Sequence, residues 1–130
     1  MRGQTSMEFL AFFGILLGIL VVFSIFSFYR NAEMQARAAD AAGWNVCKLV
    51  AGELNIAAAV GDGYTHSFYL PARLENSREY LVWLNSDEKT VEAAWTGGDC
   101  LLPVTAAFAQ GEFHTGQNSV SNRGGVVYVE

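Results

Sequence analysis

An apolar stretch without a single charged side chain, residues 9–29, constrains this chain more than any other feature. A helix rises about 1.5 Å per residue, so the stretch is long enough to cross a hydrocarbon layer roughly 30 Å thick. Secretory signals that are cleaved usually have an apolar region of only about 7–15 residues, although Ala36 and Ala38 could imitate a secretory cleavage site. We therefore predict a membrane-spanning helix.

Basic groups flank the apolar stretch on both sides and bear on its orientation. Arg2 and the amino terminus precede it, and Arg30 follows it. Positive charge is more common on the cytoplasmic side of a membrane helix, so the first pair favours a cytoplasmic N-terminus, while Arg30 weakens that preference. We expect an N-in, C-out orientation with the C-terminal part outside the cell.

A polar pattern lies directly before the apolar stretch. After the basic-glycine pair Arg2-Gly3 come Gln4, Ser6, Glu8 and Leu10. This resembles the class III signal peptide of archaeal type IV pilins, whose pattern is Gln-x-Ser-x-Glu-x-Leu. The resemblance implies that a membrane-embedded prepilin peptidase removes residues 1–3 by cutting between Gly3 and Gln4. The apolar helix would then stay on the mature protein.

An alternative needs no signal peptide. Ser6 and Glu8 can also be the polar first turn of any anchor helix, where hydroxyl groups cap the helix and acids favour the positive end of its dipole. The segments 61–64, 70–71 and 116–129 look like parts of pilin heads as well, but they are less specific than the leader.

The resemblance implies a function in assembly. In the family, a cytoplasmic assembly ATPase and a membrane platform protein stack the apolar helices, here residues 4–30, into a filament core with the heads displayed outside. The chain would be the structural subunit of a homopolymeric archaeal surface filament for cell adhesion, and its precursor would lie in the cell membrane. Two alternatives stay open: a membrane-anchored extracellular binding protein, or a minor or secretion-associated pilin that builds no long filaments.

Apolar side chains cover every side of the predicted helix, as expected if lipid first and neighbouring subunits later surround it. Gly14 and Gly18 are four residues apart and let helices approach closely, as in the Gly-x-x-x-Gly motif, although glycine is frequent in membrane helices. We predict that cleavage takes place between Gly3 and Gln4 and that assembly depends on Gln4, Ser6, Glu8 and Leu10. We predict that helix packing depends on Gly14, Gly18, Phe12, Phe13, Leu16, Leu17 and Phe23.

Glu8 places a carboxylate at the start of an apolar helix. Such a charge is costly in a filament core unless it is paired, and the nearest cation would be the new amine of Gln4 in the same or an adjacent subunit. We predict that this pair sets the register of assembly. An N-terminal glutamine can cyclise to pyroglutamate, in which case Glu8 would need other donors such as Thr5.

Helical character continues through residues 31–60, which contain no proline. Apolar residues recur there at alternating steps of three and four, which places them on one helical face: Trp44, Cys47, Ala51, Leu54 and Ala58. We predict one helix over residues 5–60 whose amphipathic second half packs on the head, and we expect Gly43 and Gly52 to loosen or bend it.

The remainder, residues 61–130, reads as an extracellular β-rich head. Gly61 and Gly63 end the helix, since glycine takes the left-handed conformation that closes a helical C-terminus. Alternating patterns predict strands in 64–70, 79–84, 91–95 and 126–129, with turns in 86–89, 97–99 and 122–125. Residues 105–116 are predicted as a loop. The predicted fold is α+β and type IV pilin-like, a long helix on an antiparallel sheet of about four strands.

The chain has two cysteines. Cys47 lies on the predicted helix, and Cys100 directly follows the predicted turn in 97–99, where we expect a further strand to start. A disulfide between them is plausible in an extracellular head too small for a deep core, and two small buried thiols are the alternative. Together with His66 and His114 they form no recognisable zinc pattern. We expect no metal and no cofactor.

Composition argues against other functions. The chain has 8 basic and 13 acidic residues and no basic run, so we expect no nucleic-acid binding. It has no Gly-x-Ser-x-Gly or His-Glu-x-x-His motif and no phosphate-binding glycine loop, so we expect no enzyme. Acidic residues with no regular calcium-ligand spacing are expected to be solvated turn residues: Asp62, Asp87, Glu88 and Asp99.

Overall fold

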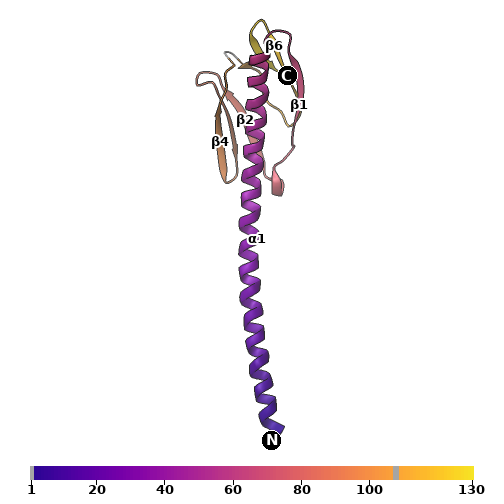
Figure 1. Cartoon of the computed structure of the whole chain (residues 1–130), viewed down its shortest axis with the longest axis vertical. Coiled ribbons are helices and arrows are strands. Elements are labelled where there is room, and N and C mark those ends of the chain that lie inside the picture. Colours follow the sequence, from indigo (N-terminus) through magenta and orange to yellow (C-terminus); the bar gives the residue numbers. More distant parts are fainter. Residues whose placement is uncertain (1, 107–108) are drawn as a thin grey trace. The chain divides into compact units, whose positions relative to one another are not determined.

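A computed structural model of the chain describes residues 2–106 and 109–130, apart from the side chains of residues 2–5 and Asn76. The helix α1 (Arg2–Val60) is followed by β1 (Thr65–Leu70), the short 3-10 helix η1 (Glu75–Ser77), β2 (Tyr80–Asn85), β3 (Thr90–Trp95), β4 (Gly98–Pro103), β5 (Ala109–Gln110), β6 (Gly116–Arg123) and β7 (Val126–Val129) (Figure 1). The predicted α+β class is confirmed.

The chain divides into two compact units. We call residues 2–35 the N-terminal segment, which is the first part of α1. We call residues 36–130 the C-terminal unit, which holds the rest of α1 and all the strands.

The strands form two sheets rather than the single sheet that we predicted. One is four-stranded, in the order β1-β6-β7-β5, and the other is three-stranded, in the order β2-β3-β4. Strands β2 and β4 lie on one side of the helix in Figure 1, and β1 and β6 on the other. The predicted loop over residues 105–116 contains β5, which pairs with β7 in parallel. A strand of two residues is too short to show an alternating pattern.

One face of α1 forms the centre of the core in the C-terminal unit. The buried residues of this face recur along the helix at steps typical of one helical face and belong to the same core as the inner faces of both sheets. On the three-stranded sheet, Val91 and Ala93 of β3 are buried. On the four-stranded sheet, Val120 and Val127 are buried. The buried helix residues are Ala39, Val46, Cys47, Val50, Ala51, Leu54 and Ala57.

The prediction that Trp44 faces the core is wrong, because its side chain is 40% exposed. The prediction is confirmed for Cys47, Ala51 and Leu54, which are all buried. The buried face is centred nearer Val50, however, and Trp44 lies beyond its edge.

Gly43 permits close packing rather than a bend. A Cβ at this position would lie 2.6 Å from atoms of the Trp95 ring, so only glycine lets the indole lie this close to the helix. The indole Nε1 of Trp95 donates a hydrogen bond to Asp40 Oδ1 at 2.9 Å, one turn earlier on the same helix. At Gly52 an added Cβ would meet nothing within 4 Å, and α1 runs through both glycines.

The helix ends where the sequence predicts. Gly61 has a φ of +89°, in the left-handed region, and its amide donates to the carbonyl of Ala57 at 3.2 Å. A second donor reaches the same carbonyl from the β6–β7 hairpin, because Asn122 Nδ2 lies 2.9 Å from it. Asp62 Oδ1 accepts a hydrogen bond from the amide of Gly124 at 2.7 Å. These bonds attach the predicted hairpin to the helix end.

Candidate functional site

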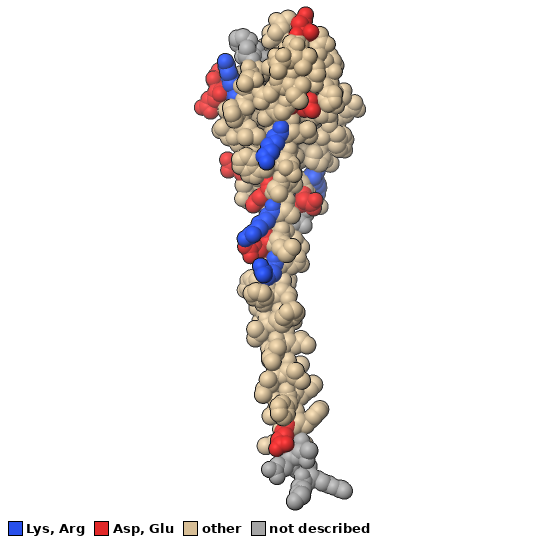
Figure 2. Space-filling model, viewed as in Figure 1, with Lys and Arg blue, Asp and Glu red and all other residues tan. Residues whose placement is uncertain are grey.

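The N-terminal segment exposes a continuous apolar surface. Its large hydrophobic side chains from Met7 to Tyr29 are between 47% exposed, at Leu17, and 76% exposed, at Phe28. Figure 2 shows uncharged surface along this stretch, and the sequence has no charged residue between Glu8 and Arg30. An apolar surface of this length is unfavourable in water and needs lipid or another protein to cover it.

The residues of the predicted leader lie at the start of α1. Gly3 and Gln4 are in the helix, but the side chains of Gln4 and Thr5 lie outside the described part of the structure. Ser6 and Glu8 are exposed, and so is Leu10. Their exposure leaves these three side chains accessible to a neighbouring subunit, and their role in assembly stays a prediction.

A shallow apolar hollow of about 580 Å³ lies along one side of the N-terminal segment. It is lined by Ile15, Gly18, Ile19, Val22, Phe23 and Phe26. An added Cβ at Gly14 or Gly18 would meet nothing within 4 Å. No contact within the described chain therefore explains these glycines, whereas close approach of a second helix would.

The predicted packing residues do not all lie in this hollow. Of the seven, Gly18 and Phe23 line it. The other five are Phe12, Phe13, Gly14, Leu16 and Leu17, and their four large side chains are all exposed. Aromatic contacts within the segment are local: the rings of Phe9 and Phe13 stack at 6.3 Å, and the guanidinium of Arg30 lies 5.6 Å from the ring centre of Phe26.

The C-terminal unit contains the predicted disulfide. Cys47 of α1 and Cys100 of β4 are bonded, and their Cα atoms are 6.6 Å apart. Both residues are buried in the core. The bond joins the helix to the three-stranded sheet across 53 positions of sequence, and it is typical of a protein that matures in an oxidising compartment.

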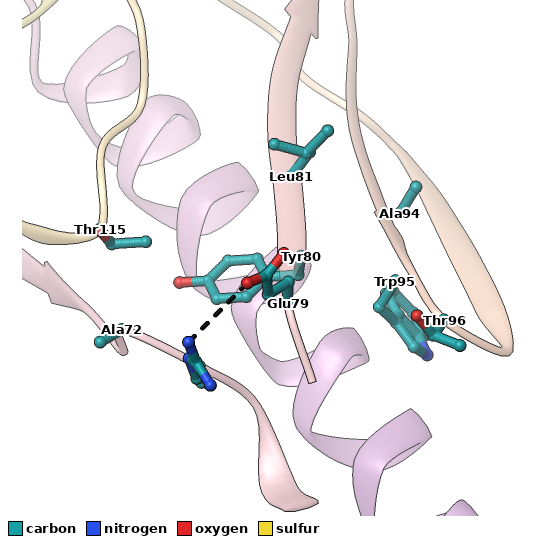
Figure 3. A pocket seen from close by; sticks show the side chains of 9 residues that line it. Ala72, Glu79, Tyr80, Leu81, Ala94, Trp95, Thr96 and Thr115 are labelled. Carbon is teal, nitrogen blue, oxygen red and sulfur yellow. Dashed lines mark ion pairs between the residues drawn. The ribbon is translucent and has the colours of Figure 1, made fainter. Parts of the chain in front are cut away.

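An open hollow of about 660 Å³ lies beside the start of β2 (Figure 3). Its lining mixes apolar and polar side chains: Ala72, Arg73, Glu79, Tyr80, Leu81, Ala94, Trp95, Thr96 and Thr115. Arg73 Nη2 and Glu79 Oε1 form an ion pair at 3.8 Å on its rim, and both side chains are mostly exposed. This lining could hold a polar ligand by hydrogen bonds.

Tyr80 lines the hollow, and the pKa of its hydroxyl is shifted. Burial, and secondarily the neighbouring Tyr69, raise the pKa of its hydroxyl above the ordinary value of 10.0. The hydroxyl donates a hydrogen bond to the carbonyl of Pro71. The folded state therefore favours the neutral, protonated phenol over the phenolate.

Each of the two histidines forms a hydrogen bond to a residue other than a cysteine. His66 Nδ1 lies 2.9 Å from Glu53 Oε2, which links β1 to α1, and the amide of His114 donates to Asn118 Oδ1 at 2.9 Å. Among the described residues, no group of three or more His, Cys, Asp or Glu side chains is placed to hold a metal ion.

Three contacts of the C-terminal unit were missed from the sequence. Asp40 accepts a hydrogen bond from Trp95, and we assigned it no contact from the sequence. Arg78 Nη1 donates to the carbonyl of Thr96 at 2.7 Å, and Asn55 Oδ1 accepts from the amide of Thr105 at 2.7 Å. Each contact links residues that are distant in the sequence, so neighbouring residues do not predict it. The one local indication is Gly43, whose place inside a helix suggests close approach of another group, here the ring of Trp95.

No family model, no curated protein and no solved structure matches this chain. The architecture is pilin-like: a long N-terminal helix with an apolar first part, packed in its second part against small β-sheets. By length and composition the helix is long and apolar enough to cross a membrane, a criterion that a signal sequence near the N-terminus can also meet.

Proposed function

We propose that this chain is the structural subunit of an archaeal type IV pilus-like surface filament. The observation that carries the proposal is the N-terminal segment, whose large apolar side chains are all exposed. Lipid covers them in the precursor, and the same segments of neighbouring copies cover them in the filament. The role is structural rather than catalytic.

Maturation follows from the leader pattern. A prepilin peptidase cuts the membrane-embedded precursor between Gly3 and Gln4, and the C-terminal unit lies outside the cell. An assembly ATPase and a membrane platform protein then move the subunit into the filament. The buried disulfide supports the placement of the C-terminal unit outside, because such bonds persist in oxidising surroundings.

The new N-terminus provides the first test. Intact mass and N-terminal peptide mapping of the protein from the cell surface should show a chain that begins at Gln4, with or without cyclisation to pyroglutamate. A chain that begins at Met1 would indicate a simple anchor, and one that begins near Ala39 would indicate ordinary secretion. Either result would contradict the proposal.

Glu8→Gln tests assembly separately from cleavage. The substitution removes the charge that we expect to pair with the Gln4 amine and keeps the size of the side chain. We expect normal cleavage at Gly3–Gln4 and few or no filaments by electron microscopy. Filament yield equal to that of the wild type would show that the carboxylate has no role in assembly, and Glu8 would then act only by favouring the N-terminus of the helix.

The hollow beside β2 favours a second candidate, a membrane-anchored extracellular binding protein. Its ligand would contact Arg73, Glu79 and Thr115. A monodisperse monomer after detergent extraction, together with cells that display no filaments of this chain, would support this candidate. Long filaments made of the chain would support the major subunit over both the anchor and a minor pilin.

A further inference from the structure

The outer face of the three-stranded sheet exposes large apolar side chains. Leu81 and Trp83 of β2 and Leu101 of β4 are 72%, 43% and 52% exposed, although the neighbouring positions on these strands are more buried. The strand register places Trp83, Glu92 and Leu101 in one row across the sheet, and Leu81, Ala94 and Asp99 in the next row. We call these two rows the sheet face.

The sheet face carries a fixed negative charge among its apolar side chains. Glu92 Oε2 accepts a hydrogen bond from Trp83 Nε1 at 3.1 Å, and Oε1 accepts one from Asn85 Nδ2 at 3.2 Å. These donors orient the carboxylate without neutralising it. Asp99 adds a second exposed acid in the next row, and no described cation forms an ion pair with either residue.

A second exposed apolar surface lies on the opposite side of the unit. Along α1, Trp44, Leu49 and Ile56 are 40%, 38% and 47% exposed, and Lys48 lies exposed between them. Positions 44, 48 and 56 are separated by multiples of four, so they form a stripe along the helix. We call these four residues the helix stripe. No other described residue forms an ion pair with Lys48.

The two surfaces face away from each other. The buried face of α1 lies against both sheets, so the helix stripe points away from the sheets, and the sheet face points away from the helix. One copy can therefore use both surfaces at the same time. Each surface is apolar with charge of one sign, negative on the sheet face and positive on the helix stripe.

We propose that the sheet face of one copy docks on the helix stripe of the next copy, with Lys48 facing Glu92 and Asp99. Apolar contact supplies the attraction, and the opposite charges select the partner and fix the register. Pairing two sheet faces would bring the acids together, and pairing two helix stripes would bring the lysines together, so charge disfavours both.

Contact between two different surfaces is heterologous, and repetition of such a contact gives an open filament unless the rotation closes a ring. The inference thus rests on the proposed function and deepens it. Assembly through the N-terminal segment leaves the C-terminal units side by side outside the membrane, and the contact gives these units a defined arrangement.

Charge reversal in the full-length chain, expressed in its own cells, tests the contact. We expect Lys48→Glu and Asp99→Lys each to lower filament yield about fivefold or more, and the double variant to return to within about twofold of the wild type. Arg123→Glu and Glu75→Lys make the same charge changes on exposed positions outside both surfaces, and they should leave the yield unchanged.

Asp99 is preferred to Glu92 for the reversal because no hydrogen bond to another described residue holds its side chain. Normal yield in both single variants, with wild-type filaments present, would overturn the contact and leave the proposed function standing. Equal losses in the control variants would also overturn it. Absence of wild-type filaments would overturn the proposed function, and the contact with it.

Zero-length cross-linking of the unmodified protein gives an independent readout. A carbodiimide joins an amine to a carboxylate only where the two touch. In filaments formed from isotopically heavy and light subunits, we expect a mixed-isotope peptide pair that joins Lys48 to Glu92 or Asp99. Cross-links of Lys48 that form only within one chain, or none at all, would count against the contact.

Discussion

The two parts of α1 have the same secondary structure but differ in what covers their apolar side chains. In the C-terminal unit, one face of the helix is buried by strands of the same chain, and Leu54 is 1% exposed. In the N-terminal segment, Leu16 is 64% exposed, like the other large apolar residues around it. A leucine thus stabilises the fold at one position and leaves an uncovered surface at the other. The comparison separates residues that complete the fold from residues that need a partner.

Loss of the disulfide should give the largest change in the stability of the C-terminal unit. In the chain-entropy model, a bond that closes a loop of 53 residues stabilises the folded state by about 4 kcal/mol. We expect the double variant Cys47→Ala/Cys100→Ala to lose about that much in chemical denaturation in detergent, followed by tryptophan fluorescence. Retention of the variant in the membrane should not change, because the N-terminal segment contains no cysteine.

The same substitution in both parts of the helix tests the comparison directly. We expect Leu54→Ala to lower the free energy of unfolding of the C-terminal unit by about 3 kcal/mol, since it leaves a cavity in the core. Leu16→Ala should leave that free energy unchanged and act only on filament yield. The comparison would fail if both variants destabilised the C-terminal unit equally.

Replacing glycine by alanine at positions 43 and 52 of the helix should change the stability of the C-terminal unit in opposite directions. Gly43→Ala forces a Cβ against the Trp95 ring and should destabilise the C-terminal unit by about 2 kcal/mol. Gly52→Ala meets nothing within 4 Å and should stabilise it by about 0.5–1 kcal/mol through helix propensity. Thermal unfolding measures both, and a loss at Gly52 would show that flexibility there is needed.

The smallest effect is the pH dependence that comes from Tyr80. Its pKa is raised by burial above the ordinary 10.0, so the folded state holds the phenolic proton more tightly than the unfolded state does. The resulting stability is fully present below pH 10.0 and is lost as the pH rises through the folded pKa. We expect ionisation of this residue to cause no change of the thermal unfolding midpoint with pH near neutrality, and the midpoint to fall above pH 10.0.

Tyr80→Phe provides the control. It removes the hydrogen bond to the carbonyl of Pro71 and should cost about 1 kcal/mol at neutral pH. The fall above pH 10.0 should become shallower, because no phenol remains at this position to ionise. An identical alkaline slope in both proteins would assign the effect to other groups.

Local patterns in the sequence were enough to predict several features. The uncharged stretch gave the apolar helix, Gly61 gave its end, and residues 122–125 gave the hairpin between β6 and β7. These signals need only neighbouring residues, because glycine permits left-handed backbone and period determines which residues share a face. With two cysteines in the chain, only one intramolecular pair was possible, and the structure contains it.

Tertiary structure alone decided the division into two sheets, the parallel pairing of β5 with β7, and the exposure of Trp44. It also decided that Gly43 receives the ring of Trp95 and that Asp40 bonds it. These features depend on residues that are distant in the sequence, 18 positions apart for Ala109 and Val127 and 55 for Asp40 and Trp95. Many pairings at such separations are compatible with one hydrophobic pattern. Packing of both sheets on a single helix selects among them, because each sheet must bury its own apolar face.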